Sequence, residues 1–226
     1  MPYKQFPVSF SRLSSYKNCA KKFLHTYVLE DVKEDKSVAA DFGVRAHQAI
    51  EDYLREDIPL PEEFIKYKMM VDHSVKRLKG VFDYERKLAK TRINTVSDWD
   101  GEDSYYRGII DLMCIHPDNT ATILDWKTGR PSMDDRQLRL FAGLVFIHYP
   151  QITEVTTQYI WLAYNSVSGK KYSREDPSLW QWLDTTVEEL SNETLWLPTP
   201  SGLCKQYCSV TECEHNGKNN KARVSE

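Results

Sequence analysis

The segment Asp125-Trp126-Lys127-Thr128-Gly129 places a carboxylate and an amine two residues apart, directly after the β-prone run 121–124. Side chains of a strand alternate between its faces, so Asp125 and Lys127 are expected on one side and Trp126 on the other. The glycine ends the strand. An acid and an amine that converge at a strand end could bind a cation and orient water, although a surface salt pair would have the same pattern.

A second acid, Asp111, lies in the preceding β-prone run 105–115, and the turn-forming residues 116–120 separate the two runs. A hairpin centred on Asp118 places Asp111 opposite Asp125, because both are equally far from that centre. Directly opposed carboxylates lie about 5 Å apart and destabilise a sheet. A divalent cation removes this cost, and oxygen ligands suit Mg²⁺ or Mn²⁺. The same register predicts the pairs Ile110–Trp126, Leu112–Leu124 and Cys114–Thr122.

The elements Gly108-Ile-Ile-Asp111 and Ile123-Leu-Asp125-Trp-Lys127-Thr-Gly129 resemble the PD-(D/E)XK nucleases, in particular the RecB-type and CRISPR-adaptation exonuclease branch. The resemblance implies an α/β fold with a restriction-endonuclease-like core, in which helices flank a mixed central β-sheet. It also implies a divalent-metal-dependent DNA exonuclease that prefers single-stranded ends and uses Mg²⁺ or Mn²⁺. The catalytic residues would then be Asp111, Asp125 and Lys127. The resemblance also implies that the enzyme acts in DNA recombination or repair, or in phage or CRISPR DNA processing.

Further site residues follow from the same resemblance. Gly43 and His47 match a Gly-x-x-x-His element whose histidine is a metal ligand in many members, whereas a helical histidine paired with Glu51 is the structural alternative. Glu85 matches a glutamate that leans toward the metal, and a solvated strand-edge charge is its alternative. Gln137 matches the Gln of a Gln-x-x-x-Tyr element, in which Phe141 replaces the tyrosine. The Trp126 backbone carbonyl would complete the metal ligands.

The cysteines suggest a second metal site. The tail 203–215 holds Cys204, Cys208 and Cys213, and Cys19 lies in a segment that resembles the N-terminal Ser-x-x-x-Tyr-x-x-Cys-Pro-x-x-Phe element, with Ala20 in place of proline. The cluster-bearing branch of the family has one cysteine before the nuclease core and three after it. The resemblance therefore implies a [4Fe-4S] cluster that joins both ends of the chain. A Zn²⁺ site, in which His215 could replace a cysteine, and no metal at all are the alternatives. Cys114 is expected to be a small buried apolar residue.

Apolar periodicity and turn residues predict the elements that position these side chains. We expect helices over 10–30, 38–55, 61–80, 133–148 and 177–195, and strands over 82–94, 105–115, 121–124 and 154–164. We also expect an acidic turn over 96–103 and a lysine-bearing turn over 165–171. Residues 1–217 are expected to form one nuclease domain, and residues 218–226 a polar, disordered tail.

The net charge and the distribution of apolar residues indicate which partners the protein can bind. The 226 residues carry a formal net charge of −3, so DNA contacts must come from local basic patches. No apolar stretch is long enough for a membrane span and no signal peptide is evident, which predicts a cytoplasmic protein without membrane contact. Recombination or CRISPR-adaptation proteins are candidate partners. A structure-specific endonuclease and a non-catalytic, nuclease-like DNA-binding subunit remain alternatives to the exonuclease.

Overall fold

The computed structural model describes residues 7–33 and 37–218, and the chain divides into two compact units. The terminal unit consists of the described residues of Met1–Lys36 and Leu183–Glu226, and the sheet unit is Ser37–Trp182. The tail that was predicted from residue 218 onward lies outside the described residues except for Lys218.

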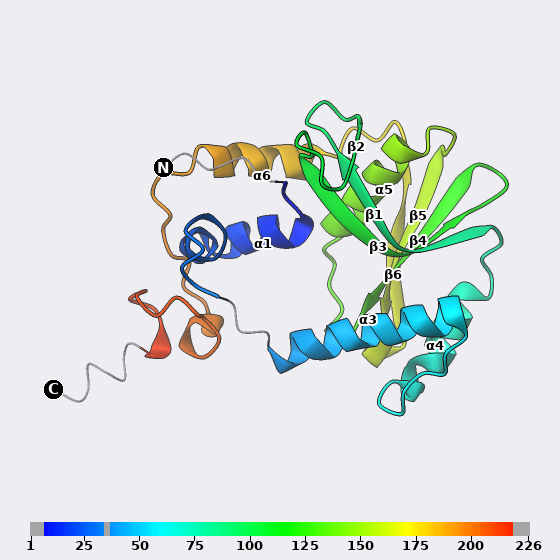
Figure 1. Cartoon of the computed structure of the whole chain (residues 1–226), viewed down its shortest axis with the longest axis horizontal. Helices are drawn as coiled ribbons and strands as arrows, with labels where there is room; N and C mark the ends of the chain where they lie inside the picture. Colours follow the sequence, from blue (N-terminus) through cyan, green and yellow to red (C-terminus); the bar gives the residue numbers. More distant parts are fainter. Residues whose placement is uncertain (1–6, 34–36, 219–226) are drawn as a thin grey trace. The chain divides into compact units, whose positions relative to one another are not determined.

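The sheet unit is built on a six-stranded mixed sheet in the order β2-β1-β3-β4-β5-β6 (Figure 1). Only β4 and β5 run parallel, and every other neighbouring pair is antiparallel. This confirms the mixed central sheet that the sequence predicted. The strands are β1 (Val81–Lys90), β2 (Val96–Ser97), β3 (Tyr106–Ile115), β4 (Thr120–Lys127), β5 (Glu154–Trp161) and β6 (Ser166–Ser173).

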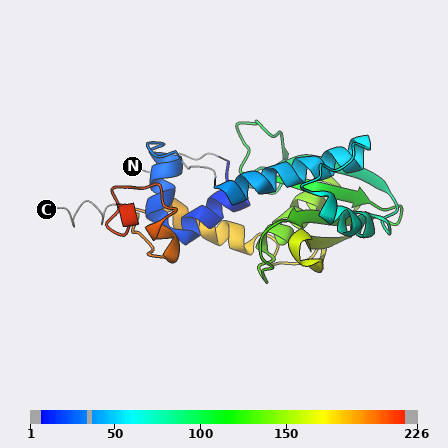
Figure 2. The ribbon, with the colours of Figure 1, turned by 90° about the horizontal axis from the view of Figure 1, so that it is seen from below.

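Helices cover both faces of this sheet (Figures 1 and 2). On one face, α3 (Val38–Glu56), η2 (Ile65–Tyr67) and α4 (Lys68–Val75) share a core with the strands, in which Ile50 packs with Leu124 and Trp126. On the other face lies α5 (Arg136–His148), which approaches β3 so closely that a Cβ at Gly108 would lie 2.8 Å from the Leu144 side chain. The short helix η3 (Leu162–Tyr164) follows β5.

The terminal unit is helical. It contains α1 (Phe10–Asn18), α2 (Ala20–Phe23), η1 (Leu24–Val28), the part of α6 (Gln181–Ser191) from Leu183 onward, and η4 (Gly202–Lys205). The Phe23 ring stacks on Trp196 with 6.3 Å between centroids, and the Tyr16 hydroxyl donates to Glu193. These contacts join the two ends of the chain within one unit. Within the described residues, no helix combines the length and the apolar character that crossing a bilayer requires.

Two predicted helices differ most in extent from those of the structure. The helix expected over 10–30 is interrupted at Cys19, whose backbone is extended (φ −165°, ψ 106°) and whose side chain caps α2. The helix expected over 61–80 contains only a short 3₁₀ turn and α4, so Lys76, Arg77 and Lys79 lie beyond its last turn. Apolar spacing alone does not distinguish one long helix from two short helices with the same buried face.

Two strands were absent from the prediction. Residues 166–173 form β6 along the edge of the sheet rather than a turn, and Val96–Ser97 form β2 within the expected acidic turn. In β6, Tyr172 is buried, whereas most of the other side chains face solvent. An edge strand that is covered on one side needs few apolar residues, so its sequence resembles that of a loop.

Candidate active site

Asp111 and Asp125 come from adjacent strands at the point where their pairing ends. The β3–β4 ladder includes the predicted pairs Leu112–Leu124 and Cys114–Thr122, and it stops one residue before Asp111 and Asp125. Beyond it, the Trp126 N–H donates to Asp111 Oδ2 at 2.8 Å. A side-chain carboxylate thus takes the place of a backbone partner, which fixes Asp111 at the point where the β3–β4 pairing ends.

Asp125 is buried and forms an ion pair with Lys127. Its exposed fraction is 2%, and its Oδ2 lies 2.5 Å from Lys127 Nζ. Burial and the neighbouring Asp111 carboxylate raise the pKa of Asp125 to about 6 against the opposing effect of Lys127. A buried anion next to a second anion needs more positive charge than one ammonium supplies.

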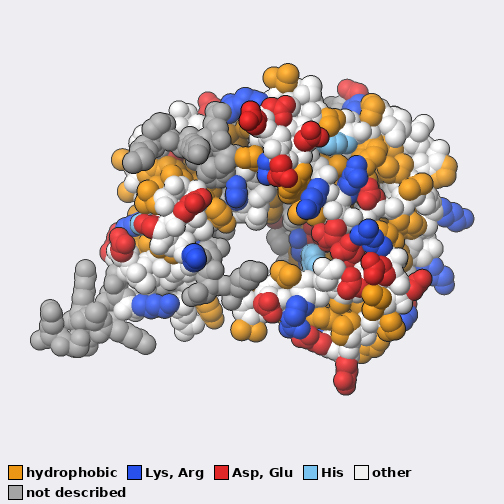
Figure 3. Space-filling view, in the orientation of Figure 1, with side chains coloured by type: hydrophobic (Ala, Val, Ile, Leu, Met, Phe, Trp, Pro, Cys, Tyr) orange, Lys and Arg blue, Asp and Glu red, His pale blue; other side chains and the backbone are white. Residues whose placement is uncertain are grey.

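His47 on α3 and Glu85 on β1 complete a group with Asp111. Each of the three residues offers a ligand atom, and these atoms lie within 4.8 Å of one another. His47 Nδ1 is 3.2 Å from Asp111 Oδ2. Burial lowers the pKa of His47, but Asp111 and then Asp125 outweigh it and raise that pKa overall. Figure 3 shows acidic side chains crowded beside a histidine where α3 runs along the sheet.

Glu85 adopts a backbone conformation that is uncommon for a glutamate, with φ of 46°. The β1–β3 ladder skips this residue, because Tyr84 pairs with Leu112 and Arg86 pairs with Ile110. The left-handed conformation costs roughly 1–2 kcal/mol outside glycine. Burial and then Asp111 and Glu51 raise the pKa of Glu85 to about 7. Strain and a raised pKa at one position are typical of functional sites.

This donor set fits a divalent cation. Two carboxylates and one imidazole converge beside the buried Asp125. Burial, and then repulsion from Asp111, raises the pKa values of Asp125 and Glu85, and a bound cation would relieve that repulsion. Carboxylate oxygens suit Mg²⁺, and an imidazole nitrogen broadens the site toward Mn²⁺. The structure brings His47, Glu85 and Asp111 together, and the buried Asp125 lies close enough for Asp111 to raise its pKa.

Lys127 is held by two elements besides its own strand. Its Nζ donates to Gln137 Oε1 at 3.0 Å, from the first turn of α5, and it lies 5.2 Å from the centroid of the Tyr159 ring on β5. Tyr159 is not among the site residues that the sequence predicts. The parallel pairing of Asp125 with Tyr159 explains its place beside the site, and that pairing has no signal in the local sequence.

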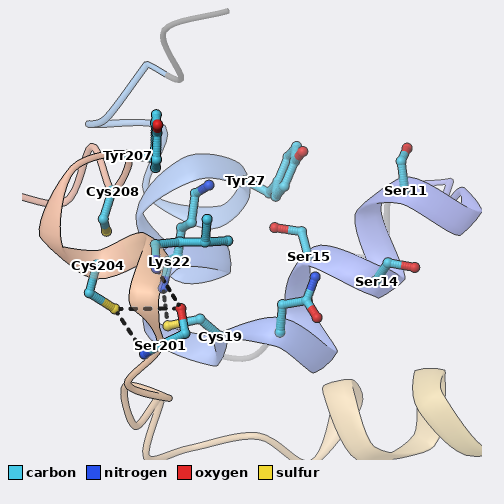
Figure 4. Close-up of a pocket in the computed structure, with 12 residues that line it drawn as sticks. Ser11, Ser14, Ser15, Cys19, Lys22, Tyr27, Ser201, Cys204, Tyr207 and Cys208 are labelled. Carbon is cyan, nitrogen blue, oxygen red and sulfur yellow. Dashed lines mark hydrogen bonds between the residues drawn. The ribbon is translucent and has the colours of Figure 1, made fainter. Parts of the chain in front are cut away.

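The four cysteines of the expected cluster all belong to the terminal unit. Cys19, Cys204 and Cys208 line one open cavity of about 430 Å³, whereas Cys213 is buried and is not part of its lining (Figure 4). Backbone N–H groups point at two of the sulfurs. Those of Lys22 and Thr199 donate to Cys19 Sγ, both at 3.5 Å, and that of Ser201 donates to Cys204 Sγ at 3.3 Å.

These contacts do not amount to a formed metal site. Tetrahedral zinc ligands at about 2.0–2.3 Å from the ion lie about 3.3–3.8 Å from one another. Across the described part of the terminal unit, no three histidine, cysteine or acidic ligand atoms lie within 4.8 Å of one another. The expectation of a shared site for Cys19, Cys204, Cys208 and Cys213 is therefore not shown, and a closed zinc tetrahedron, with or without His215, is absent from this region. Cys114 is buried in the sheet unit, as expected.

The chain matches one protein-family model and is similar to solved structures of low sequence identity. The PD-(D/E)XK nuclease superfamily model matches residues 7–213. No curated protein matches the chain. Among solved structures, a candidate exonuclease from Eubacterium rectale is 12% identical, with a TM-score of 0.49 over 82% of this chain and 81% of that one. SSO0001 is 11% identical, with a TM-score of 0.41 over 96% of this chain and 89% of that one.

Proposed function

Because the chain belongs to the PD-(D/E)XK nuclease superfamily, we propose that it is a metal-dependent deoxyribonuclease that hydrolyses DNA from its ends. The observation that carries the proposal is the convergence of His47, Glu85 and Asp111 beside the buried Asp125. A non-catalytic DNA-binding subunit would not need this repulsive group of carboxylates, so catalysis is favoured over the binding-only alternative.

The roles that we propose combine the motif resemblance with the contacts of these residues. His47, Asp111 and Asp125, with Glu85 and the Trp126 carbonyl, would hold Mg²⁺ or Mn²⁺. When bound, such an ion lowers the pKa of water and offsets charge on the phosphate. Lys127 lies against Asp125 and would hold the attacking water by donating a hydrogen bond.

Gln137 accepts from Lys127 and so restrains its ammonium. From the first turn of α5, the same side chain would help to position the water or the scissile phosphate. Hydrolysis breaks the phosphodiester by in-line attack of that water. The leaving oxygen departs on the opposite side.

The choice of an exonuclease with single-stranded preference rests on the motif resemblance to the RecB-type and CRISPR-adaptation branch. The same resemblance suggests recombination, repair or CRISPR-adaptation proteins as partners. An endonuclease with this site would use the same residues, because the hydrolysis itself is identical. The two differ only in whether the substrate needs an end.

A [4Fe-4S] cluster held by Cys19, Cys204, Cys208 and Cys213 is part of this proposal. Three of the four thiols line one cavity, and backbone donors to cysteine sulfur are a known means of tuning such clusters. Zinc remains the alternative, although it would require the ligands to move together. No step of the hydrolysis uses this site.

The test compares single-stranded DNA that is linear and end-labelled with the same strand closed into a circle. The proposal predicts Mg²⁺- or Mn²⁺-dependent release of short products from the linear strand and much slower loss of the circle. Equal rates on both substrates would favour the endonuclease. Absence of cleavage on every DNA in the presence of both metals would overturn the nuclease proposal.

A further inference from the structure

The half of β3 that precedes Asp111 presents one open face. Tyr106 and Ile110 are fully buried, and Gly108 lies against α5. The alternate residues point the other way, toward the face that carries Asp111. On that face Ile109 is 38% exposed, which is unusual for an isoleucine in a central strand, and Arg107 is partly exposed. The face next to the candidate metal site is thus partly open, most of all at Ile109.

The strand register continues this face onto β1. Lys87 pairs with Ile109, and Ala89 pairs with Arg107. Lys87 is exposed. At a rise of about 3.4 Å per residue, Ile109 and Lys87 lie about 7 Å from Asp111 along the strand, and Arg107 about 14 Å. Two cations therefore follow the acidic group at intervals similar to the spacing of phosphates in an extended strand.

An aromatic ring lies between these two cations. Trp99, from the loop after β2, is 5.7 Å from Lys87 Nζ and 5.4 Å from Arg107 Cζ, measured to its ring centroid. Arg107 Nε donates to Ser104 Oγ at 3.1 Å, which fixes the guanidinium beside the ring. Cations interleaved with an aromatic ring are the usual composition of a surface that binds single-stranded nucleic acid.

One acid competes for Arg107. Asp100 Oδ1 lies 3.6 Å from Arg107 Nη1, and the Asp100 side chain is 88% exposed. An ion pair this long and this exposed contributes little. A phosphate can therefore replace Asp100 as the partner of Arg107. The exposed acids Asp98 and Glu102 flank this cluster in sequence, and their negative charge limits the extent of the positive surface around Arg107. A positive surface of this size suits a few phosphates of one strand.

Building on the proposed nuclease function, we propose that Lys87, Trp99 and Arg107 bind the nucleotides adjoining the scissile phosphate of a single DNA strand. Lys87 and Arg107 contact backbone phosphates. Trp99 contacts an unpaired base. A base in a duplex is already stacked and paired, so this surface favours single strands and frayed ends.

Binding is measured by fluorescence anisotropy with a short labelled single strand and with the blunt duplex, in an Asp111→Asn background that prevents cleavage. Lys87→Ala and Arg107→Ala should each weaken single-strand binding severalfold and lower the slope of log K against log salt by about 0.7. Trp99→Ala should weaken single-strand binding by about tenfold and duplex binding much less, and Trp99→Phe should retain most of the affinity.

Arg86→Ala is the matched control. Arg86 neighbours Lys87 but pairs with Ile110, whose side chain belongs to the opposite, buried face, so its loss should leave binding unchanged. Asp100→Asn should tighten binding, because it removes the competitor for Arg107. A purely structural role for this cluster predicts weaker binding instead.

Failure of this inference can be distinguished from failure of the nuclease proposal. If the unmodified protein cleaves single strands and Asp111→Asn does not, yet Lys87, Trp99 and Arg107 variants bind with unchanged affinity and salt slope, only this surface is rejected. If the unmodified protein cleaves no DNA, the nuclease proposal fails, and this inference fails with it.

Discussion

At the scale of single residues, the charges of the site lower the folding stability of the metal-free protein. Asp125 is buried beside Asp111, and its pKa is raised to about 6, whereas an unfolded aspartate titrates near 4. Between these values the folded protein binds more protons than the unfolded chain, so its stability falls as pH rises from about 4 to about 6. The raised pKa of Glu85 extends this loss to about pH 7, and the raised pKa of His47 acts in the same direction.

We therefore predict that Mn²⁺ or Mg²⁺ stabilises the protein more at pH 8 than at pH 5. At pH 8 the carboxylates repel one another unless a cation is bound, and a shift of two pKa units corresponds to on the order of 3 kcal/mol. Thermal unfolding at both pH values, with metal and with a chelator, measures the effect. Asp125→Asn should flatten the pH dependence of the metal-free protein. A metal-induced rise in Tm that is the same at both pH values would contradict this electrostatic account.

Substitution of His47 tests whether the residues of this group bind a metal ion. Because its imidazole lies within reach of both Glu85 and Asp111, we predict that His47→Ala weakens Mn²⁺ binding by about tenfold or more and reduces the cleavage rate strongly. Calorimetric titration with Mn²⁺ reports the affinity independently of activity. His73→Ala, on α4 outside the group, serves as the control. Unchanged affinity in His47→Ala would make this histidine a structural residue.

At the scale of elements, the position of α5, which carries Gln137, depends on its close packing against Trp180. Gly143 in this helix faces Trp180, and a Cβ there would lie 2.5 Å from the indole ring. Trp180 cannot move freely, because Tyr106 packs against it and the Lys90 ammonium lies 4.3 Å from its ring centroid. The glycine therefore permits a close approach that no other residue allows.

We predict that Gly143→Ala destabilises the protein. Alanine in a helix gains about 1 kcal/mol over glycine, but overpacking against a fixed ring costs about 1–3 kcal/mol. Gly202→Ala is the matched control, since a Cβ there meets open space. Denaturant unfolding of both variants gives the comparison. A Gly143→Ala protein that is more stable than the unmodified one would show that the ring yields.

The elements also show what the sequence could predict. The turn at residues 116–120 and the apolar faces on both sides of it were sufficient for the register of Leu112 with Leu124, because a one-residue slip would expose the buried face. The positive φ of Glu85 and the place of Tyr159 beside Lys127 were not predictable. Both depend on neighbouring strands that are distant in sequence, so no local pattern carries them. The strand β6 was missed because only one of its faces is covered.

At the scale of the whole molecule, segments from the N-terminal and C-terminal parts of the described chain meet in the terminal unit. Cys19 and the tail cysteines Cys204 and Cys208 line one cavity although nearly the entire sheet unit lies between them in sequence. Closing so long a loop restricts the unfolded chain, so a metal or cluster bound by both ends would add to folding stability.

We predict that protein purified without oxygen is brown and contains iron and sulfide. Cys19→Ala should lose both the colour and part of the thermal stability, whereas Cys114→Ala, which alters a buried sheet residue, should keep the colour. Metal analysis by mass spectrometry and visible absorbance measure the result. Colourless protein with stoichiometric zinc would select the zinc alternative, and metal-free protein of full stability would reject both sites.

The most direct test of the central claim is cleavage of an end-labelled single strand by the unmodified protein and by Asp111→Asn, Asp125→Asn and Lys127→Ala. Each reaction is run with Mn²⁺, with Mg²⁺ and with a chelator. Circular dichroism of each variant confirms that it is folded. We predict cleavage only by the unmodified protein and only with metal. Cleavage that persists in the chelator, or full activity in any one of the three folded variants, would contradict the assignment of this site.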